Sequence, residues 1–148
     1  MTLSLAATAV VIAPNLAGAS PPDALTRVSS DTSVTGAADV DYDADRLAIA
    51  DTDASSVVAS GTTISSFGAS DSLDSPRGVA WGPNELYVSD TGNDRVLEFV
   101  LDGEEWVLSN EWSLGVGSDP RGLDYGGGLV YVADAGLDKV HKLSLIHI

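Results

Sequence analysis

Residues 75–99 read SPRGVAWGPNELYVSDTGNDRVLEF, and strand-forming runs alternate there with turn-forming residues. Runs rich in Val, Tyr, Leu and Phe favour β-strands. The Gly, Pro, Asn and Asp residues between the runs favour tight turns. With the hairpin turn Asp102-Gly103 that follows, the stretch predicts four antiparallel strands, at 78–81, 85–89, 95–101 and 105–114.

The same pattern recurs at a regular spacing along the chain. Pro76-Arg77-Gly78-Val79 returns 44 residues later as Pro120-Arg121-Gly122-Leu123, and the same spacing carries Asp90 onto Asp134. A weaker copy lies 39 residues upstream and places Asp51 at the position of Asp90. Periods of about 40 residues with several strands each are typical of propeller blades. We therefore predict an all-β fold, a β-propeller fragment of radially arranged, four-stranded antiparallel blades.

The best-preserved copy also resembles a known family of repeats. Pro-Arg-Gly-Val-Ala, followed by Leu-Tyr-Val-Ser-Asp-Thr-Gly-Asn-Asp-Arg-Val-Leu-Glu-Phe, is similar to an NHL repeat, which is a β-propeller unit. The similarity is close over 75–99, good over 119–142 and degenerate over 36–59. The first copy has Asp39 where the family pattern has Gly, and Asp-Ala-Ser-Ser at 53–56 where the pattern has Gly-Asn-x-Arg. The resemblance covers roughly residues 25–142 and implies an NHL-like propeller.

Four segments are expected along the chain. They are a signal peptide at 1–19, a linker at 20–24, a partial propeller at 25–143 with units at about 36–74, 75–118 and 119–143, and a non-native tail at 144–148. The signal peptide is predicted from the apolar run Leu3–Ile12 and the small-x-small site Ala17-Gly18-Ala19. The ending LSLIHI resembles a translated sequencing adapter. Because propellers close with about four to eight blades, we expect a fragment or a chain that associates with further copies.

The 148-residue chain carries a formal net charge of −15 and no cysteine. Such an acidic surface repels nucleic-acid phosphates and anionic membranes, so we discount nucleic acid as a partner and membrane insertion of the mature domain. An acidic surface also suits concentrated salt, where repulsion between carboxylates is screened. Together with the leader signature, the composition favours a secreted or cell-surface, extracytoplasmic protein.

Asp51, Asp90 and Asp134 occupy the same place in the three copies. One hypothesis makes them a ring of carboxylates that binds a cation. The alternative, which we favour, makes them structural turn residues that accept hydrogen bonds from nearby amides. We favour it because the position repeats with the blade, whereas functional sites usually break a repeat.

A second acidic set alternates along the first copy, at Asp39, Asp41, Asp43 and Asp45. An EF-hand calcium loop needs Gly at its sixth position and Glu at its twelfth. A loop that starts at Asp39 has Ala44 and Ala50 there instead. We therefore predict a solvated turn and no metal site or other cofactor, with weak calcium binding by another geometry as an open alternative.

Arg77 and Arg121 directly precede the predicted innermost strands of their units. In a propeller this position lies on the face formed by the inter-blade loops. Two guanidinium groups there could hold the carboxylate or phosphate of a protein or small-molecule ligand. The alternative, which we favour, is a structural ion pair with turn acids such as Asp90 or Asp134.

Catalysis has little support in the sequence. Gly-x-Ser-x-Gly does not occur, and His141, the only histidine before residue 147, falls on the strand position of Leu97. We therefore predict no catalytic residue and expect a binding scaffold that acts through the inter-blade loop face. Two alternatives stay open. The chain could be part of a propeller hydrolase or lyase whose catalytic residues lie in missing blades, or a repeat module of a larger cell-surface protein.

Overall fold

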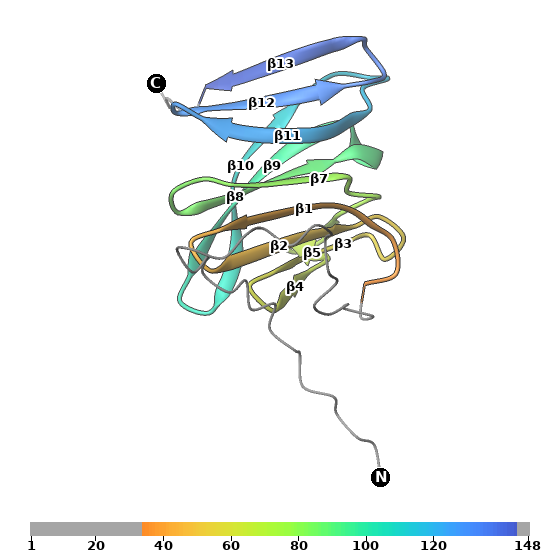
Figure 1. The fold of residues 1–148 in the computed structure, drawn as a ribbon. Coiled ribbons are helices and arrows are strands. Elements are labelled where there is room, and N and C mark those ends of the chain that lie inside the picture. The colour runs from red at the N-terminus through yellow and green to blue at the C-terminus, as the bar shows by residue number, and fades with distance from the viewer. Residues whose placement is uncertain (1–33, 145–148) are drawn as a thin grey trace, which may run out of the picture. The chain divides into compact units, whose positions relative to one another are not determined.

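The structure, a computed structural model, describes residues 34–144. The predicted signal peptide, the linker and the last four residues lie outside this part of the chain. Within these residues, three antiparallel sheets of three or four strands and one two-stranded sheet follow one another along the chain, which confirms the all-β prediction (Figure 1). No helix within the described part has the length and apolar character that crossing a bilayer requires.

Each sheet is a meander in which consecutive strands pair. Blade one consists of β1 (Ala37–Asp43), β2 (Arg46–Asp51), β3 (Ser56–Ala59) and β4 (Thr62–Ile64). Blade two consists of β7 (Gly78–Trp81), β8 (Glu85–Asp90), β9 (Arg95–Asp102) and β10 (Glu105–Ser113). Blade three consists of β11 (Pro120–Gly126), β12 (Leu129–Asp134) and β13 (Lys139–Ser144). A small hairpin of β5 (Ser66–Phe67) and β6 (Asp71–Ser72) joins blade one to blade two.

Two local features differ from the predicted elements. The first copy of the repeat predicts a fourth strand over 62–67, but β4 ends at Ile64 and the chain bends so that β5 pairs with β6 instead. The bend brings the ring of Phe67 edge-on against Phe99, with 5.2 Å between the ring centroids. The turn after β8 contains a 3₁₀ helix, η1 (Thr91–Asn93), which ends at Asp94 with a φ of 53°.

The hydrophobic core lies between the sheets rather than within one of them. Leu86 and Val88 of β8 belong to a cluster shared with blade one, whereas Tyr87 between them belongs to a cluster shared with blade three. Successive side chains of a strand point to opposite faces, so β8 contributes to both clusters. Blade two is therefore buried on both faces, and its neighbours supply most of that burial.

The innermost strands are joined by side chains that cross from one blade to the next. The Asp39 and Asp41 carboxylates of β1 accept the backbone N–H groups of Val79 (3.1 Å) and Trp81 (2.7 Å) in β7. These two N–H groups lie on the edge of β7 that β8 does not pair with. Asp39 and Asp41 therefore complete the hydrogen bonding of a strand edge, a role that differs from the predicted solvated turn.

Threonine hydroxyls make a second type of inter-blade bond. Thr52 Oγ1 donates to the carbonyl of Pro76 at 2.7 Å, and Thr91 Oγ1 donates to the carbonyl of Pro120 at 2.5 Å. In both cases the residue after a turn aspartate holds the start of the innermost strand of the next blade. The threonine that follows the repeated aspartate therefore joins each of blades one and two to the next blade.

Candidate functional site

The three repeated aspartates lie at the ends of β2, β8 and β12, with at most 3% of each residue exposed. Each carboxylate accepts at least one backbone N–H from the segment before the first strand of its own blade. The donors, at 2.7–3.0 Å, are Thr35 and Gly36 for Asp51, Asp74 for Asp90 and Asp119 for Asp134. The aspartates thus hold the blade entry against the turn after the second strand.

Two of the three aspartates also bind amides of their own turn. Asp51 accepts from the amide of Ala54 at 3.1 Å, and Asp134 accepts from those of Gly136 and Leu137 at 3.0 and 3.1 Å. Asp90 differs, because its local donors are side chains: Asn93 Nδ2 at 2.9 Å and Arg95 Nε at 2.6 Å.

The hydrogen bonds keep the carboxylates of Asp51 and Asp134 ionised. Burial alone would raise the pKa of Asp134, but bonds from the Asp119 amide, His141, Ser118 and the Leu137 amide outweigh it and hold that pKa well below its usual range. The pKa of Asp51 is lowered chiefly by the backbone amide of Thr35. Each carboxylate oxygen of Asp51, Asp90 and Asp134 therefore already accepts at least one hydrogen bond from the protein.

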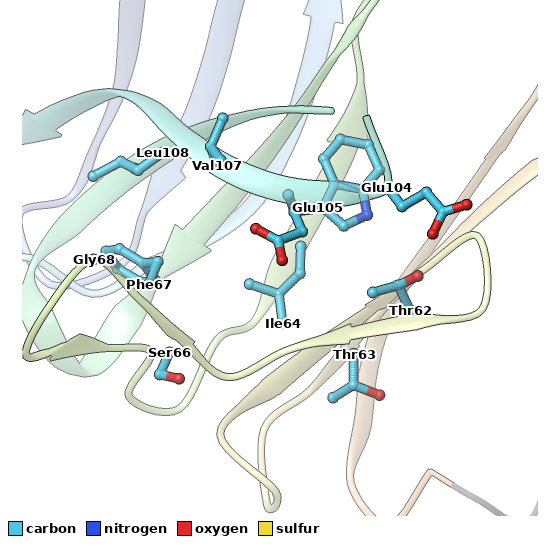
Figure 2. A pocket seen from close by; sticks show the side chains of 11 residues that line it. Thr62, Thr63, Ile64, Ser66, Phe67, Gly68, Glu104, Glu105, Val107 and Leu108 are labelled. Atoms are coloured by element: carbon cyan, nitrogen blue, oxygen red, sulfur yellow. The ribbon is translucent and has the colours of Figure 1, made fainter. Parts of the chain in front are cut away.

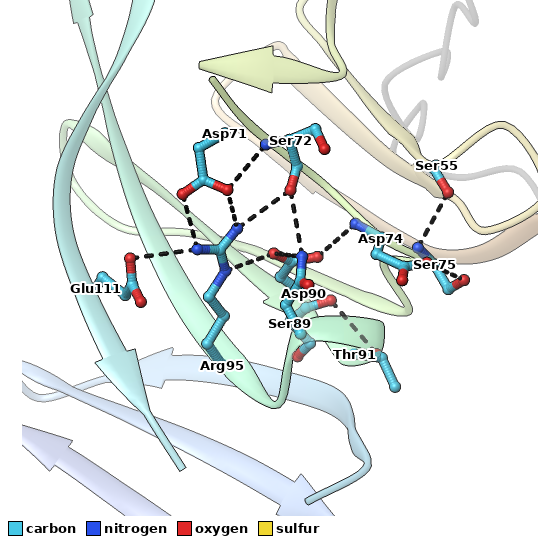
Figure 3. A network of polar contacts seen from close by, with 11 residues as sticks. Ser55, Asp71, Ser72, Asp74, Ser75, Ser89, Asp90, Thr91, Arg95 and Glu111 are labelled. Atoms are coloured by element: carbon cyan, nitrogen blue, oxygen red, sulfur yellow. Dashed lines mark hydrogen bonds and ion pairs between the residues drawn. The ribbon is translucent and has the colours of Figure 1, made fainter. Parts of the chain in front are cut away.

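Arg95, which the sequence analysis did not single out, holds the centre of a polar network (Figure 3). Its Nη1 and Nη2 donate to the two oxygens of Asp71, each at 2.9 Å, and its Nε donates to Asp90 at 2.6 Å. Glu111 lies further away, at 3.4 Å from Nη1. The bond to Asp71 raises the pKa of Arg95 further, so the guanidinium stays charged. The network is a structural clamp between the β5–β6 hairpin and β9.

His141 takes the corresponding role in blade three. Its Nε2 lies 2.7 Å from Asp134 Oδ2, and Ser118 Oγ donates to that same oxygen at 2.7 Å. The aspartate therefore lies between the serine and the histidine. A nucleophilic serine would instead have to donate to the histidine, so this arrangement is not a nucleophile–base pair. The position of His141, seven residues after Asp134, is the signal that the sequence offered for this contact.

The two predicted ligand-binding arginines, Arg77 and Arg121, differ in their side-chain partners. Arg121 pairs with Asp119 through Nε (3.0 Å) and Nη2 (2.7 Å), and this contact raises its pKa. Arg77 is partly buried, and its guanidinium has no hydrogen-bond or ion-pair partner among residues 34–144. The other described arginines, Arg46 and Arg95, also pair with carboxylates. The expected ion pair with a turn acid is therefore not made by Arg77, and Arg121 makes one with a different acid.

The backbone around Arg77 is held closely. The amide of Arg77 donates to the carbonyl of Ser89 at 3.1 Å. A Cβ on the next residue, Gly78, would collide with the carbonyl oxygen of Arg121, so the two innermost strands approach each other here without a side chain between them. The start of β7 is therefore a fixed base from which the Arg77 side chain projects.

Other parts of the described surface offer shallow clefts. One of about 570 Å³ lies between the outer strands of blades one and two, where Ile64 of β4 and Glu105 of β10 point toward one another (Figure 2). A second of about 660 Å³ adjoins it around Leu101 and Trp106. Neither cleft includes Arg77 or a turn aspartate. No group of three His, Cys, Asp or Glu side chains within residues 34–144 is arranged to hold a metal ion.

Comparison with solved structures bears on the fold. A 6-phosphogluconolactonase-like protein from Bacteroides uniformis superposes with a TM-score of 0.58 and 17% identity, over 73% of this chain and 38% of its own. The architecture is propeller-like. An inactive variant of virginiamycin B lyase from Staphylococcus aureus superposes with a TM-score of 0.49 and 17% identity, over 69% of this chain and 34% of its own. The chain thus spans less than two fifths of either neighbour. No family model and no curated protein matches the chain.

Proposed function

We propose that this chain is part of an NHL-like β-propeller that acts as a binding scaffold, and that Arg77 holds an anionic group of its ligand. The ligand is a protein or small molecule that carries a carboxylate or phosphate. The observation that supports this proposal is that, of the four arginines within residues 34–144, only Arg77 has no partner among the described residues, although the whole chain carries a net charge of −15.

The surroundings of Arg77 favour anion binding. Its side chain is partly buried, and its backbone is fixed by Ser89 and by the close approach of β11. A guanidinium on a fixed base loses little further freedom when it binds, and its planar donors match both oxygens of a carboxylate or phosphate. Partial burial also strengthens the attraction relative to a fully solvated charge.

The proposal is tested with inorganic phosphate as the probe. Titration of phosphate into the full chain, followed by NMR of the arginine Nε–Hε groups, should perturb Arg77 and saturate. Arg77→Gln should abolish the saturable response, whereas Arg121→Gln should retain it because Arg121 already pairs with Asp119. Equal responses in both variants, or a linear response in the wild type, would refute the assignment of Arg77.

We further propose that the protein is exported and acts outside the cytoplasm. The supporting feature is the leader-like sequence at 1–19, with Ala17-Gly18-Ala19 before Ser20. Expression of the full chain in a bacterium should yield a periplasmic or secreted product whose N-terminal residue is Ser20. An uncleaved product that begins at Met1 and stays in the cytoplasm would contradict export.

A further inference from the structure

Blades one and three each carry exposed hydrophobic side chains on the face turned away from blade two. On blade one these are Val40 and Tyr42 of β1, with 61% and 47% exposed. They alternate with Asp39 and Asp41, whose carboxylates reach β7, so they point to the opposite face. The described residues around Val40 and Tyr42 leave both side chains exposed to solvent.

The outer face of blade three has the same character. Tyr131 of β12 is 40% exposed and Val140 of β13 is 68% exposed. Their neighbours Val130 and Val132 are fully buried against blade two, which places Tyr131 on the other side of the strand. A hollow of about 360 Å³ beside this face is lined by Gly122, Asp124, Tyr131 and Val140 of blade three and also by Asp39 of blade one.

The repeat shows what covers these positions inside the molecule. In blade two, Val79 and Trp81 occupy the positions of Val40 and Tyr42 in blade one. Both are buried against blade one, with only 2% and 5% of their surfaces exposed. Tyr87 and Val96 stand where Tyr131 and Val140 stand in blade three, and both are fully buried against blade three. Each exposed end face is therefore one half of an interface that the chain already makes twice.

The two halves are complementary, and both lie on one chain. We propose that the chain binds a second copy of itself, with the outer face of blade three in one copy packed on the outer face of blade one in the other. The contact is heterologous, because it joins two different surfaces. The contact would repeat between two copies the packing that the blades make with one another within one chain.

Two details of blade three support this pairing. Gly78 leaves room for the carbonyl of Arg121, and Gly122, its equivalent, has nothing within 4 Å of an added Cβ. Asp124 occupies the place of Asp41, whose carboxylate accepts the N–H of Trp81. Tyr42 occupies the place of Trp81. We therefore expect the Asp124 carboxylate to accept the N–H of Tyr42 in the second copy.

Sedimentation velocity of the full chain at about 1–100 µM tests the proposal. The wild type should form dimers or larger species. Val140→Asp and Val40→Asp each place a charge in the proposed contact and should weaken association roughly 30-fold or more, the scale of a disrupted interface hot spot. Leu101→Asp is the matched control, because Leu101 is 53% exposed and lies outside both end faces. It should associate like the wild type.

A mixture of the two interface variants gives the decisive result. Each variant keeps one intact face, so an equimolar mixture of Val140→Asp and Val40→Asp should form a one-to-one dimer although each variant alone is monomeric. Formation of that dimer also shows that both variants are folded. A monomeric wild type at about 100 µM, or interface variants that associate as strongly as the wild type, would overturn the proposal.

Discussion

Single buried carboxylates hold the entry of each blade in place. Asp134 accepts bonds from three backbone amides, a serine hydroxyl and a histidine ring nitrogen within its own blade. A charged acceptor with several donors contributes more than a neutral one, and this one holds both the segment before β11 and the turn after β12. The side chain is therefore more important to stability than its small size suggests.

Asp134→Asn should lower the free energy of unfolding by about 2–3 kcal/mol, because asparagine replaces a charged acceptor with a neutral one. Chemical denaturation at pH 7 measures this change. Asp138→Asn is the matched control: Asp138 is exposed, its φ is 51°, and asparagine tolerates that conformation. The control should change stability by less than about 0.5 kcal/mol. Equal effects at the two positions would contradict the role of Asp134.

The same aspartate should make stability depend on pH. Folding lowers its pKa, so its contribution is fully present above the ordinary aspartate pKa of about 3.9 and is lost as the pH falls through the lower folded value. The midpoint of chemical denaturation of the wild type should decrease as the pH is lowered below about 4. The midpoint of Asp134→Asn should decrease less over the same pH range. Parallel pH profiles for the two proteins would contradict the linkage.

A substitution at Tyr87 should change the free energy of unfolding in the opposite direction. The Tyr87 ring stacks on Tyr125 with 5.8 Å between centroids, but its buried hydroxyl has no hydrogen-bond partner within the described residues. Burial also raises the pKa of the hydroxyl, which stays neutral. Tyr87→Phe should therefore raise the free energy of unfolding by up to about 1 kcal/mol, because it removes an unsatisfied polar atom. A loss of stability in thermal denaturation would show that the hydroxyl has a partner.

Residue types were more predictable than their partners. The repeat identified Asp51, Asp90 and Asp134 as structural candidates, and hydrogen bonds within the turn follow from short-range chemistry. Their bonds to the blade entry span 15 or 16 residues and depend on how the first strand packs, which a local pattern does not contain. The pairing of Arg95 with Asp71 was missed for the same reason, because the two residues lie 24 positions apart.

At the scale of elements, strand positions followed closely from the sequence. β7 covers the predicted 78–81, and the other strands of blade two end within one residue of the prediction. Val, Tyr and Leu runs between Gly, Pro and Asp turns carry this information locally. The break between β4 and β5 was not predicted, because it depends on the distant ring of Phe99.

Equivalent glycines in adjacent innermost strands should respond differently to the same substitution. Gly78→Ala places a Cβ against the Arg121 carbonyl and Ser89 Oγ, so it should lower the free energy of unfolding by about 2 kcal/mol or more. Gly122→Ala meets no atom within 4 Å and should change it by less than about 0.5 kcal/mol. Urea denaturation at low protein concentration, where copies are separate, measures both. Similar losses would show that β7 and β11 do not approach as described.

For the whole molecule, the acidic charge opposes compaction. At a net charge of −15, repulsion among carboxylates should destabilise the folded chain at low ionic strength. Salt at about 0.5 M reduces the screening length to a few ångströms. The melting temperature at pH 7 should therefore rise by several degrees between about 20 mM and 0.5 M NaCl. The rise should shrink near pH 4, where carboxylates lose much of their charge. A melting temperature that falls with salt at pH 7 would indicate that ion pairs such as Arg95–Asp90 dominate instead.

The carboxylates that β1 extends to the edge of β7 bear on aggregation. An open strand edge is a template on which foreign chains add, and a negative charge held against that edge blocks them. The edge of β7 is guarded in this way by Asp39 and Asp41, but Gly78 and Ala80 at the corresponding places in β7 give β11 no such protection. Of these two innermost strands, β11 should therefore be more prone than β7 to pair with a foreign chain.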